Sequence, residues 1–546
     1  MATLVAEAVS QSRSEQICNA PQSESTAQPH ESTFSIFLVS ALTLFAVAIN
    51  GYHPYAEDGG LYLAGILRLL DPALYPHCTV FVLEPMRHSL FAPTVAGIVR
   101  WSHLSLPIVL LALYLASIWT TLFAAWMLAS RCWYSRSARA GSVVLLACWL
   151  ALPIAGTALL FMDPYATARS FSTPCMVLAL VGTLDLTERG SPHRLISIRR
   201  GFLLWAISIA LAAVMHPLMA AYALGATLML YAVRFHNRIL RLYAASALAA
   251  AAMALAVCLN AIARPESADY LRIALTRTYW FLVQWHWYEL AGLAAPLGIL
   301  TISISNKLAP ATRIPCLSDM GARQTLTRMA VAVGATSCLI ALFFARTAST
   351  TQIIARLQPL RAFQIVYLIL ILTLGAQLGE RLLRLIALRW AATMILLGGI
   401  MFYTALNAFP NSNHLEIPGL TPHNQWIKAF LWIRDNTPTD ALFALDADYI
   451  NAPGEDAQCF RAIAQRSALA DYSKDGGEAS IAPELTVDWI RSQQAQHHLS
   501  APSTTDSDRI SALQPLGVSW VVLESAATTR FDCPYSNSAV KVCLLR

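Results

Sequence analysis

The chain has 546 residues, of which 56% are hydrophobic and only 13% carry a charge. Because soluble domains usually hold about 25% charged residues, this composition excludes a cytosolic enzyme and a disordered protein as leading interpretations. The net charge of +6 is too small to indicate a polyanionic partner, so no nucleic acid is expected to bind. A polytopic membrane protein is the expected class.

The N-terminal residues 1–32 are rich in Ser, Gln and Glu, which predicts a disordered cytoplasmic tail. The first apolar run, from Phe34 to Ile49, ends in small residues that could form a signal-peptide cleavage site. The segment before it lacks the positive charge of a signal peptide, so an uncleaved membrane span is favoured. This span opens a membrane domain predicted over residues 33–407.

Two adjacent carboxylates, Glu57 and Asp58, stand in the first outer loop, which is predicted over residues 51–103. Such a pair is unusual in so charge-poor a chain, and it could act as a general base or bind a divalent cation. Gly59 and Gly60 follow, and they would let a substrate approach the backbone. The alternative is an exposed loop in which Asp58 caps the helix that follows.

Ten further apolar stretches complete a predicted α-helical membrane domain of about eleven transmembrane helices. His216-Pro217 splits one long apolar run into two short halves, and such a break is tolerated only where protein or water surrounds it. The stretches lie near residues 104–129, 140–161, 171–187, 201–215, 217–233, 242–263, 288–305, 329–345, 360–379 and 390–407.

Basic residues in the loops indicate the orientation of the chain. With the N-terminus in the cytoplasm, the cytoplasmic loops hold seventeen basic residues and the opposite loops hold ten. This bias follows the positive-inside rule. It predicts a multi-pass protein of the plasma (inner) membrane with a cytoplasmic N-terminus and an extracytoplasmic C-terminus.

The second outer loop contains Arg169 followed by hydroxyl-bearing residues. This combination suits a phosphate group, because a guanidinium binds phosphate through two parallel hydrogen bonds. Asp163 in the same loop is expected to be a cap or the partner of an arginine. A simple turn between two spans is the alternative for the whole loop.

His216 lies at the break between two short membrane helices, where an ionisable residue is a functional-site candidate. A hydrogen bond from its ring to a carbonyl freed by Pro217 is the competing account. The fifth outer loop holds Arg356, Gln358 and Arg361 directly before a span. Arginines on this side oppose the positive-inside trend, which suggests an anionic headgroup, while snorkelling to the interface is the alternative.

Residues 408–546 change character, because the charge content rises and the apolar runs shorten. Amphipathic helices are predicted over 424–435 and 486–497, and buried strands over 441–445 and 518–523. These elements predict a small extracytoplasmic α/β domain that is large enough for a core of its own.

Eleven cysteines are present, and three of them (Cys459, Cys533 and Cys543) lie in this C-terminal domain. In an oxidising compartment, a disulfide between Cys533 and Cys543 would close a terminal hairpin. No CxxC motif or His/Cys cluster with zinc spacing occurs, so a structural zinc site is not expected.

Three short motifs carry a resemblance to a known superfamily. They are Tyr55-Ala56-Glu57-Asp58-Gly59-Gly60, Arg169-Ser170-Phe171-Ser172-Thr173-Pro174 and His216-Pro217. With its many spans and its C-terminal domain, the chain resembles the GT-C superfamily of membrane glycosyltransferases over about residues 34–546. That superfamily includes protein mannosyltransferases, oligosaccharyltransferases and lipid A aminoarabinose transferases. The chain is more similar to poorly characterised bacterial relatives.

The resemblance implies transfer of a sugar from a polyprenyl-phosphate donor to an acceptor on the outer face of the membrane. Glu57 or Asp58 would match the acidic residue that serves as catalytic base or metal ligand, although the chain has Glu-Asp where the family has Asp-Glu or a spaced Asp pair. Membrane lipids are expected partners, and a divalent cation is the only cofactor considered. The residues expected to bind substrate or phosphate are Arg169, His216, Arg356, Gln358 and Arg361.

Two other classes of function stay open. A transporter or flippase for a lipid-linked or anionic solute would use the same arginines but would need no base. A non-catalytic envelope protein would use its outer domain to bind a partner. Candidate residues gathered around one outward-facing cavity would favour the transferase, a pathway between pseudo-symmetric halves would favour transport, and scattered residues would favour the envelope protein.

Overall fold

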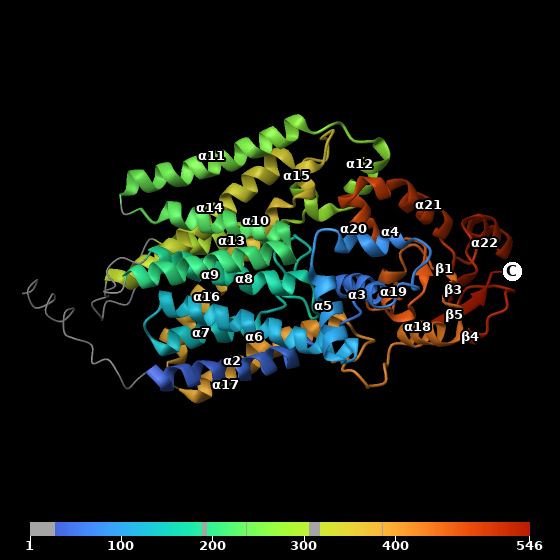
Figure 1. Ribbon diagram of the computed structural model, residues 1–546, viewed down its shortest axis with the longest axis horizontal. Coiled ribbons are helices and arrows are strands. Elements are labelled where there is room, and N and C mark those ends of the chain that lie inside the picture. Colours follow the sequence, from blue (N-terminus) through green and yellow to red (C-terminus); the bar gives the residue numbers. More distant parts are fainter. Residues whose placement is uncertain (1–27, 188–193, 236, 305–316, 385, 546) are drawn as a thin grey trace, which may run out of the picture.

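The computed structural model describes residues 28–187, 194–235, 237–304, 317–384 and 386–545. A bundle of long helices occupies one end of an elongated molecule, and a small domain formed by the C-terminal part of the chain occupies the other (Figure 1). We call the end of the bundle that carries this domain the domain end. Residues 1–27, most of the predicted disordered tail, lie outside the described residues, and the first described helix already begins at Gln28.

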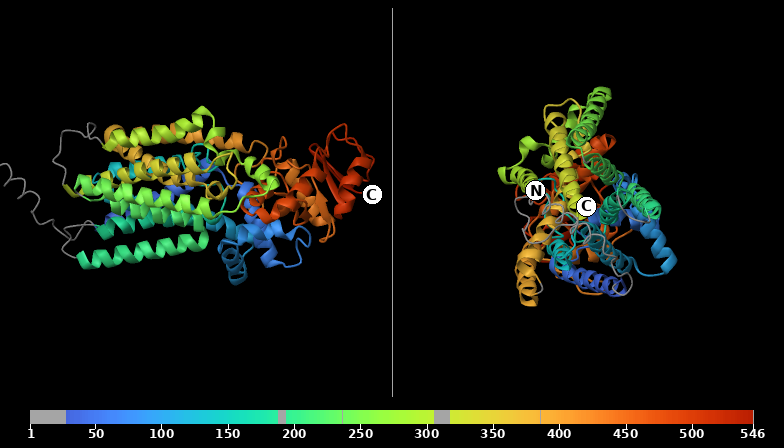
Figure 2. Two further views of the ribbon diagram at one scale, coloured as in Figure 1. Left: turned by 90° about the horizontal axis from the view of Figure 1, so that it is seen from above. Right: turned by 90° about the vertical axis from the view of Figure 1, so that its left-hand side faces the viewer.

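The long helices run side by side along the length of the bundle (Figure 2). Within the described ranges, nine helical segments are long and apolar enough to cross a membrane, and α10, with 17 residues, is a shorter apolar helix. The chain is therefore a polytopic membrane protein. The helices of the bundle are α2 (Gln28–Asn50), α6 (Leu106–Cys132), α7 (Arg136–Cys148), α8 (Ala168–Thr187), α9 (Arg194–Met215), α10 (Pro217–Val233), α11 (Arg238–Ile262), α13 (Trp287–Ile304), α14 (Leu317–Phe344), α16 (Phe363–Leu378) and α17 (Ala387–Ala408).

The predicted span over residues 140–161 is not one continuous helix. Its helix, α7, ends at Cys148, and the chain then turns back on itself in a short bridge between Pro153 and Leu160. Helix α7 crosses α16 so closely that a Cβ on Gly141 would lie 2.2 Å from the carbonyl oxygen of Gly375. Because most of this segment is buried among other helices, its irregular backbone is shielded from lipid.

Short helices fill the domain end. They come from residues 51–103 and from the connections that precede α13 and α16 (Figure 1). Their bounds are α3 (Glu57–Leu70), α4 (Thr79–Leu83), α5 (Phe91–Ser102), α12 (Ala268–Leu275) and α15 (Ile353–Arg356), with short 3-10 turns at Glu84–Met86, Thr278–Trp280, Leu282–Gln284 and Pro359–Ala362. A π-turn at Gly379–Leu383 follows α16 and lies against the start of α7.

The C-terminal domain is built on a five-stranded mixed sheet in the order β2-β1-β3-β5-β4. Strand β1 pairs in parallel with β2 and β3, whereas β5 is antiparallel to β3 and β4. The small α/β domain predicted from the sequence is confirmed. Its elements are α18 (Gln425–Asn436), β1 (Leu442–Ala444), α19 (Phe460–Ala464), β2 (Ser467–Ala468), α20 (Lys474–Ile481), α21 (Thr486–Gln496), α22 (Asp506–Leu513), β3 (Trp520–Glu524), β4 (Tyr535–Ser536) and β5 (Val540–Leu544).

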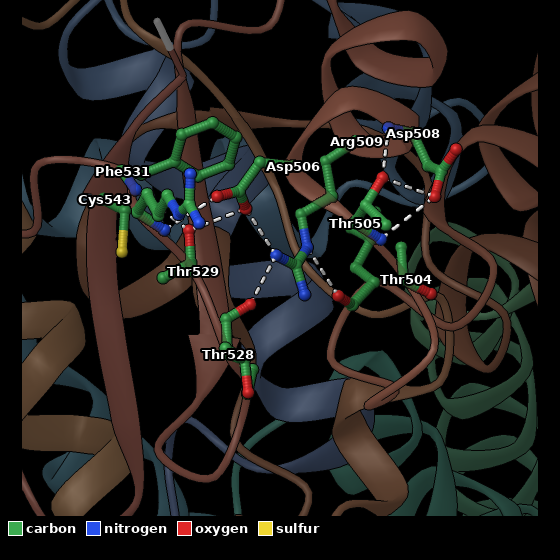
Figure 3. Close-up of polar contacts among 12 residues, drawn as sticks. Thr504, Thr505, Asp506, Asp508, Arg509, Thr528, Thr529, Phe531 and Cys543 are labelled. Carbon is green, nitrogen blue, oxygen red and sulfur yellow. Dashed lines mark hydrogen bonds and ion pairs between the residues drawn. The ribbon is translucent and has the colours of Figure 1, made fainter.

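A buried arginine ties the last part of this domain together (Figure 3). The Arg509 guanidinium is fully buried and donates to the carbonyl of Leu499 at 2.9 Å, to the carbonyl of Thr528 at 2.9 Å and to Asp506 at 2.6 Å. Asp506 also accepts a bond from the backbone amide of Arg530 at 2.7 Å. The loop after β3 is therefore fixed to α22, directly before the disulfide that joins Cys533 and Cys543.

Replacing Arg509 by Met should lower the free energy of unfolding of the C-terminal domain by about 3 kcal/mol or more, because Asp506 and two carbonyls lose a buried charged partner. Pulse proteolysis of the full-length protein in detergent measures this change. Arg530→Met is the matched control, because the Arg530 side chain lies exposed in the same loop. This exchange should change the free energy of unfolding by less than about 0.5 kcal/mol. Equal effects of the two exchanges would contradict this account.

Candidate active site

The two carboxylates of the first outer loop occupy the first turn of α3. The residue that caps this helix is Ala56, so the predicted alternative in which Asp58 is the cap is wrong. A carboxylate in a first helical turn is favoured by the positive end of the helix dipole. The Asp58 side chain is consequently free to project from the helix toward other elements.

Backbone hydrogen bonds hold the start of α3 against two distant segments. The amide of Glu57 donates to the carbonyl of Ala457 at 2.8 Å, and the amide of Cys459 donates to the carbonyl of Tyr55 at 2.9 Å. The amide of His53 donates to the carbonyl of Pro164, in the second outer loop, at 2.8 Å. The C-terminal domain and the second loop therefore both position the carboxylates.

The two glycines after Asp58 serve this packing. A Cβ on Gly59 would lie 2.9 Å from the ring of Tyr165, and a Cβ on Gly60 would lie 2.2 Å from the Cβ of Cys459. These positions are already filled by protein atoms. Gly59 and Gly60 therefore do not admit a substrate, contrary to the expectation from the sequence. They allow close contact with the second loop and the C-terminal domain.

Arg169, in the first turn of α8, is shared between two carboxylates. Its Nη2 lies 3.1 Å from Asp58 Oδ2 and 2.8 Å from Asp163 Oδ2. Asp163 is thus the partner of an arginine, one of the two roles expected for it. Two of the hydroxyls that follow are already engaged within the helix, because Ser172 and Thr173 both donate to the Arg169 carbonyl.

A lysine from the C-terminal domain completes the cluster, and the sequence analysis did not identify it. Lys474, the first residue of α20, places its Nζ 3.3 Å from Asp58 Oδ1 and also forms an ion pair with Glu57. The side chain is only 15% exposed. The next residue, Asp475, is fully buried and pairs with Arg461 at 2.7 Å, which fixes the first turn of α20.

The surrounding charges keep Asp58 ionised. Burial by itself would raise the pKa of its carboxyl, but Lys474, Arg169 and Arg361 together hold that pKa well below its usual range. In return, Glu57 and Asp58 outweigh burial and raise the pKa of the Lys474 ammonium. The two domains thus meet through charged groups that depend on one another.

Arg361 lies in the 3-10 turn Pro359–Ala362, where the charges of Arg169 and Asp58 act on its guanidinium. Its Nε is buried, and in the described part of the chain its guanidinium forms neither an ion pair nor a hydrogen bond. The charges of the same three groups act on His216, which caps α10. Within those ranges His216 Nδ1 is also buried and has no hydrogen-bond partner on another residue.

The other two residues of the fifth outer loop lie apart from the carboxylates. Arg356 forms an ion pair with Glu266 and lies 5.4 Å from the centre of the Tyr270 ring. Gln358 adopts a positive φ of 49°, and its carbonyl accepts a bond from the Tyr222 hydroxyl at 3.0 Å. The left-handed turn at Gln358 therefore separates the direction of Arg356 from that of Arg361.

Glu478 is a second group that the sequence analysis missed. It follows Lys474 by one helical turn on α20, so both side chains project from the same face. Burial, followed by the charges of Asp58, Asp475 and Glu84, raises the pKa of the Glu478 carboxyl to about 8. At neutral pH this side chain is mostly a neutral acid beside an ionised aspartate.

The carboxylate pair does not fit a divalent cation. Both Glu57 and Asp58 are bound by the Lys474 ammonium, which occupies the position between them that a cation would need. Calcium takes six to eight oxygen ligands, and no group of three or more His, Cys, Asp or Glu side chains suited to a metal occurs among the described residues.

Two features of the sequence point to Lys474 in retrospect. It is one of only four lysines in a chain whose remaining 34 basic residues are arginines. The segment Asp475-Gly476-Gly477-Glu478 also repeats the acidic and glycine content of the first-loop motif. Neither feature shows that the two segments meet.

No protein-family model matches the chain, and no curated protein matches it. Its structure is similar to the archaeal oligosaccharyltransferase AglB from Archaeoglobus fulgidus in complex with an inhibitory peptide and a dolichol-phosphate, at 12% identity and a TM-score of 0.42, over 90% of this chain and 70% of that one. The apo form of the Archaeoglobus fulgidus oligosaccharyltransferase gives 11% identity and a TM-score of 0.44, over 91% and 70%. The arabinofuranosyltransferase AftD from mycobacteria gives 14% identity and a TM-score of 0.48, over 94% and 41%.

Replacing Gly60 by Ala should loosen the C-terminal domain from α3, because the new Cβ overlaps Cys459. Overpacking of this kind costs about 1–3 kcal/mol. Hydrogen exchange at the Glu57 and Cys459 amides should become faster. Gly97→Ala, in α5 and with no atom within 4 Å of the new Cβ, is the matched control. Unchanged exchange in the Gly60 variant would contradict the contact.

Replacing Glu478 by Gln should remove a pH dependence of stability. The folded-state pKa of about 8 lies above the ordinary glutamate pKa of 4.5, so folding binds a proton and stability falls as the pH rises between these values. The Tm of the wild type, relative to the variant, should drop by on the order of 5 °C between pH 5 and pH 8.5. The exposed Glu524→Gln in the same domain controls for loss of a carboxyl group. A pH-independent difference between wild type and the Glu478 variant would contradict this assignment.

Proposed function

We propose that the protein is a membrane glycosyltransferase that moves a sugar from a polyprenyl-phosphate donor to an acceptor hydroxyl on the outer face of the membrane. One observation carries the proposal. An aspartate kept ionised by Arg169 and Lys474 also feels the charge of Arg361, a guanidinium with a buried Nε and no carboxylate partner in the described ranges, at the end of an apolar helix bundle.

Asp58 is the proposed base. Its depressed pKa makes it a weak base, so it accepts a hydrogen bond from the acceptor hydroxyl and takes the proton only as the new C–O bond forms. The hydroxyl oxygen attacks the anomeric carbon from the side opposite the phosphate, and the configuration at that carbon inverts. Arg169 and Lys474 orient the carboxylate during this step. Glu57 is paired with Lys474 and supports the same arrangement.

Arg361 is the proposed phosphate ligand. A free guanidinium binds a phosphate through two hydrogen bonds and stabilises the charge that grows on the leaving polyprenyl phosphate. Arg169 is already shared by two carboxylates, and Arg356 is committed to Glu266, so these two arginines are assigned supporting roles. His216 Nδ1 is available to a phosphate oxygen, and the prenyl chain would lie between the membrane helices. No step requires a metal ion.

The domain end is proposed to face the outside of the cell, with the N-terminus in the cytoplasm of a plasma (inner) membrane. The distribution of basic residues in the loops supports this orientation. The disulfide between Cys533 and Cys543 fits an oxidising compartment. Membrane lipids surround the bundle, and the acceptor reaches Asp58 between the bundle and the C-terminal domain.

Loss of the donor tests the proposal directly. Purified protein in lipid nanodiscs is incubated with a panel of polyprenyl-phosphate sugars, and release of polyprenyl phosphate is followed by mass spectrometry. Asp58→Asn should slow release by about 100-fold or more, because the acceptor proton loses its base. Arg361→Gln should act similarly by removing the phosphate ligand.

The matched controls are Asp269→Asn and Arg272→Gln, which exchange an exposed ion pair at the domain end and should leave release unchanged. Full activity of the Asp58 variant would contradict the assignment of the base. Movement of an intact lipid-linked solute across the membrane by the Asp58→Asn protein would instead identify a transporter.

A further inference from the structure

A cavity of about 380 Å³ lies on the other side of α3 from the candidate active site. Leu63 and Leu67 line it, and they project about 140° and 180° around the helix from Asp58. The cavity is bounded by α3, by the first turn of α6, by the segment 413–422 that leads into the C-terminal domain, and by α18. Its volume is in the range of small-molecule pockets.

Apolar side chains form one wall of this cavity. Leu106, Pro107 and Leu110 come from the start of α6, a membrane-spanning helix, and they face Leu63 and Leu67 of α3. The first turn of such a helix lies where lipid headgroups meet acyl chains. This wall is therefore placed to contact the upper part of a lipid chain.

The opposite wall contains buried polar atoms that lack partners. Glu416 is 8% exposed, and its Oε1 is bound to His53 at 3.3 Å and to Gln458 at 3.1 Å. Its Oε2 has no hydrogen bond to any described residue, and neither do the hydroxyl of Tyr52, which is 1% exposed, and Oδ1 of Asn413. Backbone bonds between Tyr52 and the segment 414–416 hold these groups together.

A guanidinium stands across the same cavity. Nε and Nη2 of Arg434 donate to Asp435 at 2.8 and 3.3 Å, which leaves Nη1 as the open donor within the described part of the chain. Both Glu416 and Arg434 act electrostatically on Tyr55, which also lines the cavity. Glu416 and Arg434 thus both line one pocket, whose other wall includes the start of α6.

We propose that this cavity binds the headgroup of an amine-bearing zwitterionic phospholipid, such as phosphatidylethanolamine. The ammonium donates to Glu416 Oε2 and to Asn413 Oδ1, and the phosphate accepts from Arg434 and from the Tyr52 hydroxyl. The first methylenes of the acyl chains pack on the wall from α3 and α6. Because Glu416 and Arg434 belong to the C-terminal part of the chain, the lipid links this part to the membrane helices.

Charge complementarity selects this lipid over others. An anionic headgroup without an amine would leave Glu416 Oε2 without a partner and would be repelled by the carboxylate. A quaternary ammonium has no N–H group to donate to Oε2 or to Oδ1. The cavity is therefore expected to prefer phosphatidylethanolamine to phosphatidylglycerol and to phosphatidylcholine.

Native mass spectrometry of the full-length protein, titrated in detergent with each of the three lipids, tests this inference. Phosphatidylethanolamine should bind at least tenfold more tightly than either of the others. Glu416→Gln and Arg434→Gln should each weaken its binding by about tenfold, the strength of one charge-assisted contact. Leu67→Trp, which narrows the cavity and leaves both charges in place, should also weaken this binding.

Two further measurements keep the result interpretable. Asp58→Asn should leave lipid binding unchanged, so failure of the proposed transferase activity and failure of this site are distinguishable. The Tm of each variant in lipid-free detergent identifies any that fails to fold. Equal affinities for the three lipids, or undiminished phosphatidylethanolamine binding by Leu67→Trp and Arg434→Gln, would overturn the proposal.

Discussion

The ionised carboxylate of Asp58 is the point on which the candidate site depends. Removing a carboxylate from water is costly unless cations replace the lost hydration. Here one cation, Arg169, comes from the helix bundle and the other, Lys474, comes from the C-terminal domain, 416 residues away along the chain. The site is therefore complete only when the two parts of the molecule are docked, and the docking is in turn stabilised by the charges that meet there.

Local geometry makes this meeting possible. Two glycines allow Tyr165 and Cys459 to approach the first turn of α3, and backbone hydrogen bonds join residues 55–57 to residues 457–459. On the other side, the buried pair of Asp475 and Arg461 sets the start of α20 and hence the position of Lys474. These contacts leave Arg361 as a guanidinium without a protein counter-ion in the described ranges. That arrangement is the reason why Arg361, and not Arg169 or Arg356, is the proposed phosphate ligand.

Much of this could be predicted from the sequence, because charge is so scarce in the chain. The membrane bundle and the C-terminal α/β domain follow from the lengths of the apolar runs and the change in charge content. Charges or breaks at the ends of apolar runs mark the candidate site residues Glu57, Asp58, Arg169, His216 and Arg361. Lys474 and Glu478 could not be found in this way, since their importance depends on a tertiary contact between distant segments. Arg356 looked equivalent to Arg361, but the left-handed turn at Gln358 directs it to Glu266. The helix expected over 140–161 is interrupted after Cys148, because burial inside the bundle shields its irregular backbone from lipid.

An experimental density map of the protein with a bound polyprenyl phosphate tests the central claim most directly. We expect the phosphate to lie within hydrogen-bonding distance of the Arg361 guanidinium. Lys474 should still contact Asp58, and no metal ion should lie between Glu57 and Asp58. A phosphate bound at Arg356 or elsewhere, or a metal ion held by the two carboxylates in place of Lys474, would contradict the claim.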